Sequence, residues 1–206
     1  MTVDDAHAGG GFNPPVPTNQ GGPDYGRFVE AVRELQDHAR AVDAPDDVIT
    51  KAADLLDDVN RLLAPFDADE WHSPSGRRMD LPNRGSVLSI PTDLHTAEDG
   101  RLHGTTSFRR FHLGRNGAVH GGSLAHLFDS LLGFTAFKLS DSPRNRTAFL
   151  HVNYRRIAPI DKELQVSAGI DRIEGRKIFV EGRLLDGDVV LCDAEALFVK
   201  LNPGQP

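Results

Sequence analysis

The stretch GRNGAVHGGSLAHLFDSLLG, residues 114–133, constrains the fold more than any other part of this chain. Its second half is apolar at nearly every turn of a helix. A helix that is apolar nearly all round has to be surrounded by other elements. The stretch therefore predicts a long central helix, from about residue 122 to residue 139, that is wrapped by a sheet.

The segments on either side of this helix have the period of two that is typical of strands. The expected strands are 86–94, 101–113, 147–157, 163–173, 177–185 and 189–201. In 147–157 one face is formed by Ala148, Leu150, Val152 and Tyr154, and the other by Thr147, His151, Asn153 and Arg155. One long helix and about six antiparallel strands predict an α+β domain over residues 86–203.

The N-terminal third has a different character. Residues 1–23 are rich in Gly and Pro with few apolar anchors, which predicts a disordered tail. Residues 24–65 predict a helical extension of two amphipathic helices with acidic outer faces, the second starting at Pro45. We expect these helices to serve as a lid or as a contact between subunits.

Composition excludes several classes of protein. One cysteine among 206 residues forms no intrachain disulfide and no cysteine-based metal cluster. A formal net charge of −7 argues against nucleic-acid binding. No apolar run approaches the roughly 20 residues needed to span a bilayer, and the N-terminus lacks the pattern of a signal peptide. We therefore expect a cytoplasmic protein with no membrane span, no metal and no redox cofactor.

Asp129 interrupts the apolar helix, and we expect it to be buried there. It follows Gly122 by seven residues, which places both on one helical face about 10 Å apart. A buried carboxylate is costly unless it is paired. It serves either as a general base or nucleophile, or as a structural group bonded to a hydroxyl or a partner subunit.

The sequence His120-Gly121-Gly122 precedes the helix. The glycines allow a sharp turn and leave the first N–H groups of the helix bare. Bare N–H groups at a positive helix end suit a developing oxyanion. His120 on its own is more typical of a loop histidine that bonds the turn than of a catalytic residue. With His126 six residues away it forms no metal-ligand spacing.

These residues resemble the signature of the hotdog-fold acyl-CoA thioesterases of the PaaI-like branch, with His-Gly-Gly followed by an Asp nine residues after the His. The segments TAFLHVNYRRIAPI, EGRKIFVEG and ALFVKLNP are similar to later strands of the relatives of carboxy-terminal modulator protein. The resemblance covers about residues 86–203. It implies a homodimer or homotetramer of the hotdog fold, with active sites at the subunit interface.

The resemblance also implies roles for individual residues. The Gly122 N–H polarises the thioester carbonyl, Gly121 shapes the turn, and His120 positions one or the other. Asp129, reaching in from the partner's helix, activates water or attacks directly, and Thr147 orients the water or the carboxylate. The expected reaction converts an acyl-CoA and water into the free acid and CoA, with no cofactor other than the CoA of the substrate.

Some positions depart from the family pattern. Where relatives carry an Asn or Gln six residues before the His, this chain has Gly114, and Asn116 is the candidate to replace it. Arg155 and Arg156 are candidates for binding the phosphates of CoA. The alternatives are a hotdog protein that binds acyl-CoA without hydrolysing it, and a hydratase or dehydratase acting on acyl thioesters.

Overall fold

The computed structural model describes residues 16–202, except 70–71, 141 and 143. It divides into a helical unit that ends at Val87 and a sheet domain that begins at Leu88. This division lies close to the boundary expected from the change of period in the sequence. Within the described ranges, every helix is too short or too polar to cross a membrane.

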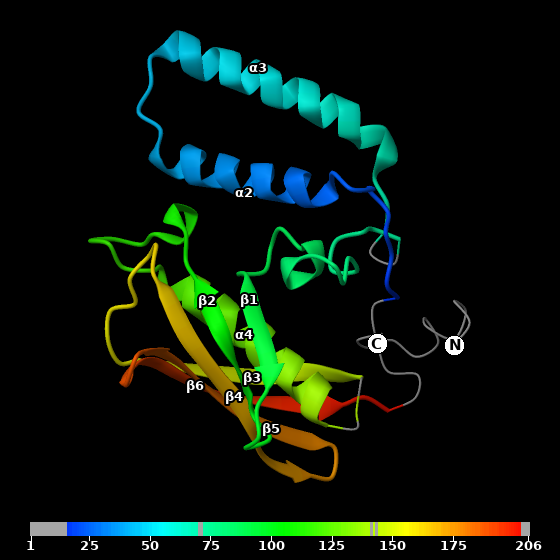
Figure 1. Ribbon diagram of the computed structural model, residues 1–206, viewed down its shortest axis with the longest axis vertical. Coiled ribbons are helices and arrows are strands. Elements are labelled where there is room, and N and C mark those ends of the chain that lie inside the picture. Colours follow the sequence, from blue (N-terminus) through cyan, green and yellow to red (C-terminus); the bar gives the residue numbers. More distant parts are fainter. Residues whose placement is uncertain (1–15, 70–71, 141, 143, 203–206) are drawn as a thin grey trace. The chain divides into compact units, whose positions relative to one another are not determined.

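The sheet domain consists of one long helix and six strands (Figure 1). Its elements are β1 (Thr92–Thr96), β2 (Leu102–Ser107), η3 (Arg110–His112), α4 (Gly121–Leu139), β3 (Asn145–Tyr154), β4 (Glu163–Glu174), β5 (Lys177–Asp186) and β6 (Val189–Lys200). All strand pairs are antiparallel and the order is β1-β2-β4-β5-β6-β3. The predicted α+β architecture is confirmed.

The strand order is not a simple meander. After β2 the chain runs through α4, and β3 then joins the sheet at the far edge, beside β6. The tight hairpins β4–β5 and β5–β6 turn at Gly175 and Gly187, both with φ +58°, a conformation that glycine adopts without strain. Strand β3 therefore has one hydrogen-bonded neighbour, and its other edge is free within the described chain.

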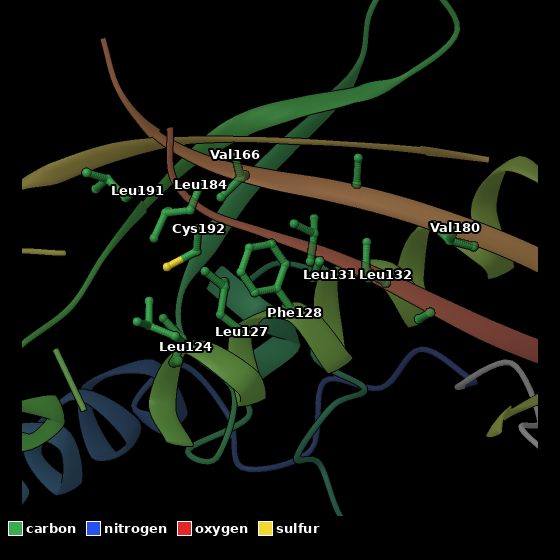
Figure 2. Packing of buried hydrophobic residues seen from close by; sticks show 14 of the residues in the cluster. Leu124, Leu127, Phe128, Leu131, Leu132, Val166, Val180, Leu184, Leu191 and Cys192 are labelled. Carbon is green, nitrogen blue, oxygen red and sulfur yellow. The ribbon is translucent and has the colours of Figure 1, made fainter. Parts of the chain in front are cut away.

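The core forms where α4 lies against one face of the sheet (Figure 2). The buried residues of α4 are Leu124, Leu127, Phe128, Leu131, Leu132, Thr135 and Ala136. They meet Val166, Val180, Leu184 and Cys192 from the strands. Close approach depends on Gly182, because a Cβ at that position would lie 2.8 Å from the Leu132 side chain. The prediction of a helix wrapped by a sheet is confirmed.

The first two strands are shorter than expected. Strand β1 begins only after Pro91, which has no N–H to give to a ladder, and it runs to Thr96 through part of the predicted turn. Strand β2 ends at Ser107, and the chain then forms the short helix η3 where a strand was predicted. The alternation of apolar and polar residues continues across these segments, but alternation alone does not show that Pro91 lacks the backbone N–H that a strand ladder needs.

The helical unit contains α2 (Tyr25–Ala41), α3 (Asp46–Leu63), η1 (Ala64–Phe66) and η2 (Pro82–Gly85). One side of α2 is buried through Val29 and Arg33. The Arg33 guanidinium donates to the Ser86 carbonyl at 2.6 Å, which ties α2 to the end of the unit. The two helices predicted within residues 24–65 are present.

The segment 1–23, expected to be a disordered tail, falls outside the described residues as far as residue 15. Its described part is held by hydrogen bonds. The Thr18 N–H donates to the Arg77 carbonyl at 3.1 Å, and Arg78 donates to the carbonyls of Gln20 and Gly22. Arg78 is itself buried and paired with Asp80. Residues 16–23 thus belong to the ordered helical unit, because buried Arg78 supplies an anchor that composition does not reveal.

Candidate active site

The start of α4 is held by the segment that leads into it. The Val119 N–H donates to the Ala158 carbonyl and the His120 N–H to the His112 carbonyl, both at 2.8 Å. Helix α4 then begins at Gly121, with His120 as its N-cap. Two distant parts of the sheet domain therefore fix the position of the His-Gly-Gly turn.

The Gly122 N–H is not bare, contrary to the prediction. It donates to Nδ1 of the His120 ring at 3.0 Å, so His120 caps its own helix. Since Nδ1 accepts this bond, the neutral ring carries its proton on Nε2. A side chain at Gly122 would have its Cβ only 3.0 Å from that nitrogen, which explains why glycine suits this position.

Tyr154 supports the same turn and was missed as a site residue. Its hydroxyl, on the last residue of β3, donates to the Gly121 carbonyl at 3.0 Å. The alternation along 147–157 carried the relevant signal, because it put Tyr154 on the face of Leu150 and Val152, both of which pack against the core. A tyrosine that ends the helix-facing side of a strand can reach the start of the helix.

Asp129 is exposed in the single chain, so the prediction of burial was wrong. The buried residues of α4 follow a spacing of three and four along one side, and Asp129 and Ser130 lie on the opposite side. The sheet covers only one side of the helix. The apolar residues on both sides of Asp129 in the sequence do not show which side that is. The carboxylate is therefore open to solvent or to a partner.

Thr147 contacts Asp129 within the same chain. Its hydroxyl donates to a carboxylate oxygen of Asp129 at 3.2 Å. Simple alternation had put Thr147 on the face away from Leu150. The register of β3 against β6 shifts between Thr147 and Phe149, and this bulge at Ala148 returns Thr147 to the helix-facing side.

The helix start and the carboxylate of one chain lie too far apart to act together. Gly122 and Asp129 are seven residues apart on one helical face, which separates them by about 10 Å. A reacting carbonyl carbon has to lie about 3 Å from both the attacking group and the oxyanion donors. One chain therefore presents two half-sites on one face of α4, one at the helix start and one about two turns further along, near the middle of the helix.

Asn116 has a structural task. Asn116 and Gly117 have φ values of +53° and +76°, and the Ala118 N–H closes the turn on the Arg115 carbonyl at 3.0 Å. Asn-Gly is the pair that such a turn favours. Among the described residues, no hydrogen bond joins the Asn116 side chain to the helix start, so the structure does not bring it to the other candidates.

Arg155 and Arg156 lie on a polar cleft of about 820 Å³, lined by residues at the end of β3, in the middle of β5 and in the first half of β6. Arg155 pairs with Asp193 through Nε and Nη2, and its hydrogen bond holds the pKa of the Asp193 carboxyl below its ordinary value. The charge of Arg155 is thus matched within its own chain. Arg156, the other predicted phosphate ligand, forms no ion pair with any of the described residues.

Comparison with known proteins gives three findings. The family model of the Thioesterase superfamily matches residues 116–193. Acyl-coenzyme A thioesterase THEM4 of Rattus norvegicus is 35% identical over 95 residues, which cover 45% of this chain and 40% of the relative. MIOREX complex component 3 of Saccharomyces cerevisiae is 37% identical over 120 residues, 56% of this chain and 42% of the relative. The match thus spans about two fifths of each curated relative.

A crystal structure of a thioesterase superfamily protein is similar over 89% of this chain and 97% of its own, with a TM-score of 0.73 and 25% identity. This coverage exceeds what the sheet domain alone could supply, so the solved protein has a counterpart of the helical unit. The hotdog architecture expected from the resemblance is confirmed. With its strand order and its central helix the sheet domain has the hotdog architecture, and it contains the segment that matches the family model of the Thioesterase superfamily.

Proposed function

We propose that this protein hydrolyses an acyl-CoA thioester to the free carboxylic acid and CoA. The observation that carries the proposal is the exposed face of α4. It presents a glycine helix start at one end and a carboxylate with a hydroxyl partner at the other. These are the donors and the base or nucleophile that acyl transfer needs.

The helix start binds the carbonyl oxygen of the thioester. On binding, that oxygen takes the Gly122 N–H in place of His120 Nδ1, and the positive end of α4 stabilises the charge that develops on it. His120 turns aside and positions the acyl group. The Tyr154 hydroxyl keeps the Gly121 carbonyl, and with it the turn, in place.

Asp129 of a second copy supplies the attack. As a base it takes a proton from water, the hydroxide oxygen adds to the carbonyl carbon, and the C–S bond breaks to release the CoA thiolate, which is then protonated. As a nucleophile its carboxylate adds to the same carbon, expels the thiolate and forms an anhydride that water cleaves. Thr147 orients the carboxylate in both routes.

The second copy is argued from the free edge of β3. An unpaired edge strand attracts another strand, and here it exposes Phe149 at 43% beside Thr147. Two copies that pair these edges continue the sheet and bring their α4 helices side by side, so each helix start faces the other copy's Asp129. A homodimer built in this way completes two sites.

The test is thiol release from a panel of short, long and aromatic acyl-CoAs, with Asp129→Asn beside the wild type. We expect the variant to lose at least 100-fold in kcat, as removal of a reacting group does. Ser130→Ala, on the neighbouring exposed position, is the matched control and keeps its rate. An Asp129→Asn enzyme of near wild-type rate would falsify the assigned role.

The two routes separate by single turnover in water enriched in oxygen-18. The nucleophile route puts label into the Asp129 carboxylate when water attacks the anhydride at that side, and the base route leaves the Asp129 peptide unlabelled. Label found in the Asp129 peptide by mass spectrometry therefore selects the nucleophile route.

Non-hydrolytic binding of acyl-CoA is the second candidate. The engaged Gly122 N–H favours it, since a site that keeps His120 on that donor holds a ligand without polarising its carbonyl. Acyl-CoA binding by the wild type without thiol release from any member of the panel would select this candidate.

A further inference from the structure

Helix α3 has a strongly apolar side, yet none of its residues is buried. Its apolar residues form three adjacent rows at seven-residue spacing, namely Val48, Leu55 and Leu62, then Ala52 and Val59, and then Ile49, Leu56 and Leu63. Leu55 is 56% exposed and Leu62 is 69% exposed. A surface of this kind on a soluble helix marks a contact site.

Helix α2 has a second exposed row of the same spacing. One of its sides is used inside the helical unit, where Val29 and Arg33 are buried. The other side carries Phe28, Val32, Leu35, Ala39 and Val42, at alternating intervals of four and three. Apart from half-buried Val32, these residues are exposed. The two helices of the hairpin (Figure 1) thus each offer an apolar seam.

The two seams match one another in an antiparallel pairing. An antiparallel alignment about the connection sets Val42 against Val48, Leu35 against Leu55 and Phe28 against Leu62, so large apolar residues of the two seams match at these three levels. The connection of residues 42–45 is extended, with ψ of +132° at Val42 and +153° at Pro45. Short connections that hold matched elements apart are the usual hinges of exchange between subunits.

Width of the apolar surface sets the number of helices that have to cover it. A seam of two residues in seven suits a pair of helices, whereas three in seven suits a helix in a larger bundle. The three rows of α3 belong to the second kind. One chain supplies two helices, and a second copy supplies the other two.

Charge favours a protein partner and selects the pairing. Helix α3 carries five Asp against Lys51 and Arg61, so it opposes an anionic membrane surface. Two copies of α3 against each other would also repel. Helix α2 has three Arg, two Glu and one Asp, and it is the better neighbour for α3.

We propose that the helical units of two copies form a four-helix bundle in which α3 of one copy packs against α2 of the other. The bundle is a subunit contact separate from the β3 edge, and it does not depend on the proposed hydrolysis. Its apolar core consists of the two seams, which are exposed in the single chain.

The experiment uses two full-length single substitutions, Leu35→Cys and Leu55→Cys, co-expressed with different tags and purified through both. A short bismaleimide cross-linker is added and the product is weighed by denaturing mass spectrometry. The native Cys192 is buried and does not compete. Thr50→Cys, on the polar side of α3, replaces Leu55→Cys in the matched control.

We expect a cross-linked product of two-chain mass from Leu35→Cys with Leu55→Cys, at a yield at least tenfold above the Thr50→Cys control. Equal yields in both pairs, or no two-chain product, overturn the proposal. A chain carrying both Leu35→Cys and Leu55→Cys that cross-links only within itself shows that the hairpin closes on its own, and this also overturns it. Thiol release from acyl-CoA, measured on the same samples, tests the proposed hydrolysis independently of the cross-linking result.

Discussion

Helices α4 and α3 are nearly equal in length, with 19 and 18 residues, and they stand in opposite environments. Helix α4 is apolar on most sides and buries seven residues against the sheet. Helix α3 has a cleaner division into apolar and acidic sides and buries none. An amphipathic sequence therefore specifies a helix with one apolar side. That side stabilises the fold only where another element of the protein packs against it.

The exposed face of α4 is an intermediate case. Strand β3 reaches it at both ends, through Thr147 on Asp129 and through Tyr154 on the Gly121 carbonyl. In the single chain this face is exposed at Gly122, Asp129 and Ser130. The helix thus uses one side for folding and keeps the other for chemistry and for a partner.

The comparison is tested most strongly by the same substitution in both helices. Leu127→Ala removes a side chain that is 1% exposed, and we expect the free energy of unfolding of the sheet domain to fall by about 2–5 kcal/mol. Leu55→Ala should change it by less than about 0.5 kcal/mol. Urea unfolding followed by labelling of Cys192, which lies in the sheet, reports on this domain alone.

Equal losses from the two substitutions would break the distinction between the helices, because α3 would then contribute to the sheet domain as α4 does. A small loss from Leu127→Ala would mean that the surrounding side chains collapse into the cavity.

Thr147 tests the comparison at Asp129, on the exposed face of α4. Thr147→Ala removes the donor to Asp129, and we expect kcat for thioester hydrolysis to fall about tenfold, equivalent to ~1.4 kcal/mol, with KM little changed. Thr147→Ser keeps the hydroxyl and restores most of the rate. Steady-state kinetics of both variants decide the matter, and an Ala variant as fast as the Ser variant would remove Thr147 from the mechanism.

Much of the fold was predictable because periodicity records burial. The apolar run of residues 122–139 correctly predicted a helix, and the alternation within β4, β5 and β6 correctly predicted strands. The exposure of Asp129 was not predictable in this way, since a run that is apolar on most sides does not show which side the sheet leaves uncovered. The bulge at Ala148 was equally hidden, and it reversed the expected direction of Thr147.

The site was predictable where a motif fixes local geometry and not where a side chain arrives from elsewhere. His-Gly-Gly located the helix start, but the bond from the Gly122 N–H to His120 depends on the ring's rotamer. Asn116 looked like a substrate ligand, and its own Gly117 neighbour was the stronger signal, for a turn. Tyr154 reaches Gly121 across 33 positions in sequence, a distance that local patterns do not span.

Tyr154 gives a smaller effect at the other end of the helix face. Tyr154→Phe removes one hydrogen bond to the Gly121 carbonyl, which is worth about 0.5–1.5 kcal/mol. We expect a loss of a few-fold in kcat and a similar small loss in unfolding free energy. Tyr154→Leu, which removes the ring stacked near Gly121 as well, should cost more in both measurements. If Tyr154→Phe leaves kcat unchanged, the turn is held without this bond.

The smallest effect concerns Cys192, whose reactivity reports whether α4 stays packed against the sheet. Burial raises the pKa of its thiol to about 11, so at pH 8 only about one molecule in a thousand carries the thiolate. We expect no reaction with Ellman's reagent in the native protein and full reaction in urea. A thiol introduced by Thr50→Cys on the exposed side of α3 should react at once. Rapid native labelling of Cys192 would show that the sheet opens away from α4, and the contrast between the two helices would then be one of degree.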